Sequence, residues 1–192
     1  ALIFSGDLSH NGTINSYIRI NEILKPLNNK AYILPGNHDN ESNLAKIFDN
    51  SLLCNFKLND WEIISIDSVQ NEKVSGYLSD QKLQTLVNEI KQSRAKYIVL
   101  CLHHPVVPMQ SSWNDDLSLE NSEDFFGAIS QFPRVRAIIW GHAHQSSEFK
   151  FGNIKLFSCP STAVQFCGPS GIGYNHYTLH DNGEINCKTR WL

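Results

Sequence analysis

With 192 residues, 41% of them hydrophobic, the chain is long enough to build a core, and we expect residues 1–192 to form a single domain. The net charge of −3, without a run of Lys and Arg along one helix face, argues against binding nucleic acid through its backbone. No apolar stretch reaches membrane-spanning length and the five cysteines form no Cys-x-x-Cys pair, so we expect a cytoplasmic protein with reduced thiols and no membrane contact.

The first forty residues predict a β-α-β unit. Residues 1–5 read as a short buried strand, residues 14–27 carry apolar side chains at helical spacing, and residues 31–34 read as a second buried strand. Polar blocks follow the two strands directly, Gly6-Asp7 after the first and Gly36-Asn37-His38-Asp39 after the second. Open α/β sheets place their sites at such carboxyl ends of strands.

The remaining elements alternate in type. We expect a short helix over 43–48, a hairpin of 56–58 and 61–67, a helix from 79 to about 93, a strand over 97–102, a helix over 122–132 and a strand over 135–140. The polar stretch 106–121 predicts a loop that faces the substrate. Two hairpins follow, over 148–158 and 174–191. This pattern predicts an α/β domain with strands of mixed direction, two packed sheets and helices outside.

Two further polar blocks follow strands in the second half, His103-His104-Pro105 and Gly141-His142-Ala143-His144. Asp, Asn and His supply the oxygen and nitrogen ligands that hold divalent metals for hydrolysis. Taken singly, Asp7 could be a helix cap and Gly36-Asn37 a plain turn. The occurrence of all four blocks after strands favours one metal centre.

The order of the blocks resembles the calcineurin-like metallophosphoesterase superfamily, through GNHD and GHAH above all. HHP and PSTAVQF make the chain similar to the class III 3′,5′-cyclic nucleotide phosphodiesterases. The resemblance implies a two-sheet β-sandwich of mixed strands flanked by helices. It also implies two metal ions (Fe, Mn or Zn) and hydrolysis of 3′,5′-cyclic AMP to 5′-AMP by a metal-activated hydroxide. A general phosphodiesterase or phosphomonoesterase of the same superfamily is the alternative.

The resemblance also assigns roles to individual residues. Asp7 would bridge the two ions, Asn37, His103 and His142 would complete one ion's ligands, and His144 would belong to the other ion. His103 is preferred to His104 as the ligand because it follows the apolar strand immediately. His38 would approach the scissile phosphate and protonate the leaving oxygen, with Asp39 as its orienting partner.

One block of the family, D-x-H, does not occur in this sequence. The ion that His144 would hold then keeps only Asp7 and His144, so we expect the fold to lack its first strand and the chain to be impaired in activity. A metal-poor, non-catalytic module is a second alternative. The strand over residues 1–5 would then have an unpaired edge, at which a second copy could associate as a homodimer.

Overall fold

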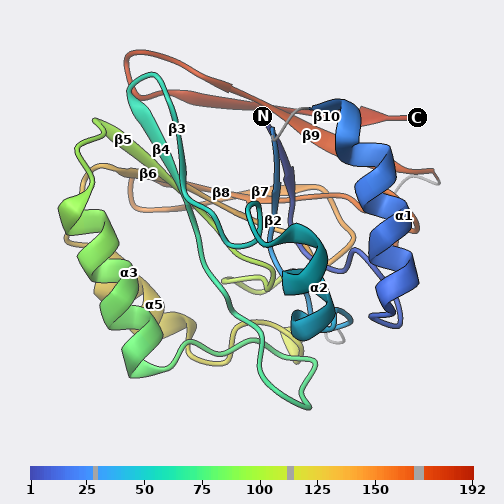
Figure 1. Ribbon diagram of the computed structural model, residues 1–192. Coiled ribbons are helices and arrows are strands. Elements are labelled where there is room, and N and C mark those ends of the chain that lie inside the picture. Colours follow the sequence, from blue (N-terminus) through green and yellow to red (C-terminus); the bar gives the residue numbers. More distant parts are fainter. Residues whose placement is uncertain (28–29, 112–114, 167–170) are drawn as a thin grey trace.

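The computed structural model describes residues 1–27, 30–111, 115–166 and 171–192 (Figure 1). Its main element is a six-stranded sheet in the order β3-β4-β5-β6-β8-β7. The strands are β3 (Phe56–Leu58), β4 (Trp61–Ser65), β5 (Tyr97–Cys101), β6 (Val135–Trp140), β7 (Ser147–Phe151) and β8 (Ile154–Ser158). The four central strands are parallel, and β3 and β7 at the edges are antiparallel to their neighbours.

Two smaller ribbons form a second layer. β1 (Leu2–Phe4) pairs in parallel with β2 (Ala31–Ile33), and β9 (Gly173–Leu179) pairs antiparallel with β10 (Ile185–Trp191). The core between the layers includes Leu34, Val99, Ala137, Phe157 and Ile185, which come from both of them. The expected sandwich of mixed strands is therefore confirmed.

Helices cover the two outer faces, as Figure 1 shows. α3 (Asp80–Gln92) and α5 (Ser122–Ile129) pack on the six-stranded sheet. α1 (Ile14–Leu24), which continues into the 3-10 turn η1 (Lys25–Leu27), and α2 (Glu41–Phe48) share a third core with β2. Ile33 faces these two helices while Tyr32 and Leu34 face the large sheet, because successive side chains of a strand alternate between its faces.

The element boundaries follow from local chemistry. α2 begins at Glu41, earlier than expected, because the Asn40 side chain accepts a hydrogen bond from the backbone N–H of Asn43. The Ser79 hydroxyl caps α3 in the same way.

Part of the expected loop over 106–121 lies outside the described residues. In the described part of the chain no helix is long and apolar enough to cross a membrane. Three expectations stay predictions: the homodimer, the cytoplasmic location and the single domain.

Candidate metal centre

The candidate ligands come from the turns after four strands, β1, β2, β5 and β6. Three of them have backbone angles that L-residues seldom adopt: φ is 57° at Asp7, 58° at His142 and 48° at His144. Such left-handed conformations cluster at functional sites, where the surrounding structure holds them in place. The turns therefore aim these side chains at a common point, at a conformational cost.

Four side chains meet there through specific atoms. His103 Nε2 lies 3.1 Å from Asn37 Oδ1 and 3.4 Å from Asp7 Oδ2. His142 Nδ1 lies 3.0 Å from Asn37 Oδ1 and 3.2 Å from His103 Nε2. Ligands about 2.1 Å from one ion stand about 3.0–3.4 Å apart in octahedral or tetrahedral geometry. The spacing of these donor atoms fits the coordination shell of a single ion.

The hydrogen bonds support the same conclusion. His103 Nδ1 donates to the carbonyl of Ser5 at 2.6 Å, which fixes the proton on that nitrogen. Nε2 faces the Asn37 and Asp7 oxygens, which only accept, so these atoms need either a proton or a metal cation between them. A metal cation shared by the three atoms would replace that proton, and the Ser5 contact is the kind that orients a metal-ligating histidine. These residues therefore fit a metal ion.

The turns approach one another so closely that glycine is needed at two positions. A Cβ at Gly6, where φ is 101°, would overlap the His103 ring. A Cβ at Gly36 would overlap the carboxylate and the backbone of Asp7. The glycines of the Gly-Asp and Gly-Asn-His-Asp blocks thus let the ligand-bearing turns touch.

The electrostatics of the cluster pair a carboxylate with a histidine. Burial favours the neutral forms of Asp7 and His103, but their mutual attraction outweighs it, so the pKa of Asp7 falls and that of His103 rises. Burial and the charge of His103 lower the pKa of His142 to about 3. Burial likewise lowers the pKa of His144. His142 and His144 are therefore neutral at physiological pH, the form in which histidine binds metal.

Asp39 holds the turns together. Its carboxylate accepts hydrogen bonds from the backbone N–H groups of Leu8, Ser9 and Gly36 and from the Tyr17 hydroxyl, at 2.9–3.2 Å. Asp39 was expected to orient the His38 ring, and the structure differs. His38 Nδ1 lies 3.2 Å from the carbonyl oxygen of His10, and the two rings stack with their centroids 4.9 Å apart. Asp39 points back into the turn instead, because three backbone donors converge on it there.

His38 itself reaches the cluster through its backbone, whose N–H donates to Asp7 Oδ1 at 3.0 Å. His144 stacks on Phe166, with ring centroids 4.2 Å apart, and its Nδ1 is buried without a hydrogen-bond partner among the described residues. The structure therefore unites Asp7, Asn37, His103 and His142 through direct contacts. It places His144 beside that group, on the turn that also bears His142.

His104 belongs to the histidine cluster but has both ring nitrogens engaged. One ring nitrogen from each of His103, His104 and His142 lies within 4.8 Å of the other two. Nδ1 pairs with the Ser68 hydroxyl at 2.8 Å, and Nε2 donates to the Val74 carbonyl at 2.9 Å. This arrangement supports the choice of His103 over His104 as ligand, and it gives His104 a supporting role.

A family model described as calcineurin-like phosphoesterase matches residues 1–146. The chain belongs to the calcineurin-like phosphoesterase family. A protein of Ruthia magnifica subsp. Calyptogena magnifica, named "Probable cyclic nucleotide phosphodiesterase", is 50% identical over 192 residues, 100% of this chain and 82% of that protein. The 3′,5′-cyclic adenosine monophosphate phosphodiesterase CpdA of Vibrio vulnificus is 32% identical over 203 residues, 100% of this chain and 74% of that protein.

Among solved structures, a dimetal phosphatase from Danio rerio matches with a TM-score of 0.64 and 15% identity, covering 82% of this chain and 71% of that one. At this identity the match supports the fold alone. The expected family is thereby confirmed, and the chain is a metallophosphoesterase.

Two contributors to the centre were not predicted from the sequence. Tyr17 was counted only among the apolar residues of its helix, although its hydroxyl contacts both Asp39 and the backbone N–H of Asn40 at 2.9 Å. His10 was given no role from the sequence, although its backbone carbonyl and its ring contact the ring of His38. Neither position carries a distinguishing pattern in the sequence, because each role arises when turns distant in the chain meet.

Proposed function

We propose that this metallophosphoesterase hydrolyses 3′,5′-cyclic AMP to 5′-AMP at a dinuclear metal site. The observation that carries the proposal is the convergence of Asp7 Oδ2, Asn37 Oδ1, His103 Nε2 and His142 Nδ1 within 3.0–3.4 Å of their neighbours. The names of the Ruthia and Vibrio relatives support a cyclic nucleotide as substrate.

The ligands divide between two ions in this proposal. Asp7, Asn37, His103 and His142 hold the first ion, while Asp7 and His144 are the ligands that the described residues offer to the second. Bound Fe, Mn or Zn would polarise the phosphoryl oxygens and lower the pKa of a bound water.

His38 acts on the substrate in this scheme. Its Nδ1–H is committed to the His10 carbonyl, so Nε2 is the nitrogen left for the substrate. The ring protonates the ribose 3′-oxygen as it departs. The stack with His10 keeps the ring from rotating, which holds that nitrogen in one direction.

The first test measures metal binding together with turnover. The chain is reconstituted with Mn, Zn or Fe, and binding is followed by calorimetry. Hydrolysis of cyclic AMP, bis(4-nitrophenyl) phosphate and glycerophosphodiesters is compared, with 5′-AMP identified as product. A rate for cyclic AMP far below the rate for the other diesters would overturn the substrate assignment and favour a general phosphodiesterase.

Matched variants test the ligand set. Asn37→Ala should lower metal affinity and kcat/KM at least 10-fold, because it removes a donor atom and even outer-shell changes cost about 10–100-fold. Asn88→Ala, which changes an exposed side chain of α3 in the same way, should leave both unchanged. Equal metal affinities of the two variants would contradict the proposed centre.

A further inference from the structure

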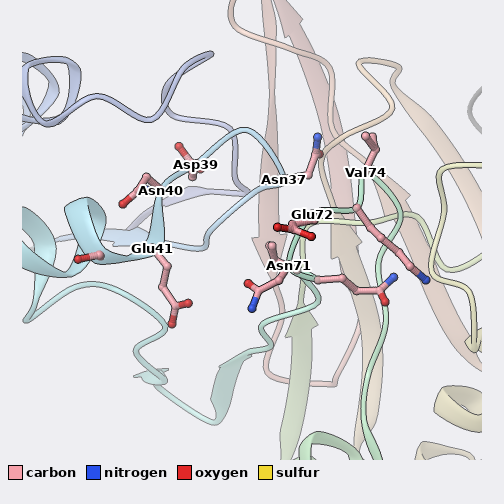
Figure 2. A pocket seen from close by; sticks show the side chains of 11 residues that line it. Asn37, Asp39, Asn40, Glu41, Asn71, Glu72 and Val74 are labelled. Atoms are coloured by element: carbon pink, nitrogen blue, oxygen red, sulfur yellow. The ribbon is translucent and has the colours of Figure 1, made fainter.

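A pocket of about 430 Å³ adjoins the metal centre and shares Asn37 with it (Figure 2). It is lined by residues 37 and 39–42 from the turn after β2 and the start of α2, and by residues 69–74. Figure 2 shows Glu41, at the start of α2, across the pocket from Asn71 and Glu72. The volume falls within the range of small-molecule sites, about 300–1,000 Å³.

The wall made by residues 69–74 is attached to the scaffold at both ends. The Lys82 ammonium donates to the Val69 carbonyl at 3.3 Å, and His104 Nε2 donates to the Val74 carbonyl at 2.9 Å. The Gln70 amide donates to the Ser75 carbonyl at 3.1 Å. The His104 bond ties this wall to the histidine cluster, so the pocket is fixed relative to the metal centre.

The free charges of the pocket are negative. The Lys73 ammonium is paired with the Glu120 carboxylate at 3.1 Å. The Asp39 carboxylate already accepts four hydrogen bonds from the protein. Glu41 and Glu72 are exposed, and neither carboxylate has a hydrogen bond or ion pair with the part of the chain that the structure describes. Ionised carboxylates only accept hydrogen bonds. They therefore suit hydroxyl and amino groups of a ligand, and they repel a second phosphate.

We propose that this pocket binds the nucleoside part of the substrate, with Glu41 and Glu72 accepting hydrogen bonds from the ribose 2′-hydroxyl or from the exocyclic amine of the base. The proposal rests on the proposed function, in which the cyclic phosphate sits at the metal centre beside Asn37. The two carboxylates thereby select a substrate with one phosphate and a donor-rich remainder, and they discriminate against polyphosphorylated nucleotides.

The test compares substrates with and without these donors. kcat/KM is measured for cyclic AMP, 2′-deoxy cyclic AMP, cyclic IMP (which lacks the exocyclic amine) and bis(4-nitrophenyl) phosphate. The variants are Glu41→Gln, Glu72→Gln and the double variant, with Glu184→Gln as control, since Glu184 is exposed in the β9–β10 turn.

In the double variant, the ratio of kcat/KM for cyclic AMP to that for the chromogenic diester should fall about tenfold, mostly through KM, as charge-assisted hydrogen bonds become neutral ones. In the wild-type chain, the analogue that lacks the bound group should have a lower kcat/KM than cyclic AMP, and in the double variant this difference should disappear. If 2′-deoxy cyclic AMP behaves in this way, the hydroxyl is bound; if cyclic IMP does, the amine is bound. Glu184→Gln should keep the wild-type ratio.

An unchanged ratio in the double variant, with both analogues turned over like cyclic AMP, overturns the pocket assignment. Failure of the proposed function looks different. There, the wild-type chain would hydrolyse the chromogenic diester without acting on cyclic AMP, or would hydrolyse neither.

Discussion

Replacing Tyr17 with Phe removes one oxygen atom from a fully buried ring and tests the clamp formed by Asp39. The hydroxyl donates to Asp39 Oδ1 and accepts from the Asn40 N–H, both at 2.9 Å. A hydrogen bond to a charged group contributes about 1.5–3 kcal/mol, and a buried donor left unpaired adds to the loss. We expect the free energy of unfolding to fall by about 2–3 kcal/mol. For a domain of this size that corresponds to a Tm lower by about 4–12 °C.

The same substitution should weaken metal binding. Asp39 connects the turn after β1, which bears Asp7, to the turn after β2, which bears Asn37. With one of its four donors gone, the carboxylate no longer holds both turns as firmly, and metal affinity should fall about 10–100-fold. The Tm is measured on metal-free protein by calorimetry, and the affinity by titration with Mn or Zn.

Tyr32→Phe is the matched control. Tyr32 is partly buried and stacks on Phe56 at 3.6 Å between ring centroids, and its hydroxyl has no hydrogen-bond partner among the described residues. Its removal should change the unfolding free energy by less than about 0.5 kcal/mol. The reasoning is refuted if the two Phe variants have the same Tm and the same metal affinity.

Three other perturbations have defined outcomes. Gly36→Ala should abolish tight metal binding in a calorimetric titration, since its Cβ overlaps Asp7; wild-type affinity would contradict this. His104→Phe removes the hydrogen bonds of the ring to the buried Ser68 hydroxyl and to the partly buried Val74 carbonyl and should lower the unfolding free energy by about 1–3 kcal/mol in urea, whereas a loss below about 0.5 kcal/mol would exclude a supporting role. Burial raises the pKa of the Cys159 and Cys187 thiols from 9.0 to about 11, so the unfolded chain releases protons that the folded chain keeps. The contribution of these two thiols to stability should therefore be constant below pH 9 and fall from pH 9 to 11, and changing both thiols to Ala should reduce the slope of stability against pH in that range.

Much of this architecture could be predicted from the sequence, because the strands end in Gly-Asp, Gly-Asn-His-Asp and Gly-His blocks, which carry the candidate ligands in a recognisable order. Short apolar runs predicted the strands, and a segment with apolar residues at helical spacing between two such runs predicted the β-α-β unit. The predicted cluster of Asp7, Asn37, His103 and His142 agrees with the distances between their donor atoms.

The parts that could not be predicted depend on tertiary contacts. A tyrosine at a helical apolar position indicates only that its ring is buried, and the partner of its hydroxyl is decided by the turn that α1 meets. Asp39 was expected to orient the ring of His38, whereas its carboxylate accepts hydrogen bonds from other parts of the chain and the His38 ring contacts the His10 carbonyl. Residues 70–73 are simply polar in sequence, and the bonds from Lys82 and His104 to the flanking valines are what make residues 69–74 a pocket wall.

The centre also has a consequence for folding. Asp7 and Asn37 follow the strands of the β1–β2 ribbon, whereas His103 and His142 follow strands of the large sheet, so an ion that binds all four would link the two layers. Binding at 100 times the dissociation constant would add about 2.7 kcal/mol to stability. Because that energy resists separation of the two layers, metal supply should govern the lifetime of the folded enzyme as well as its turnover.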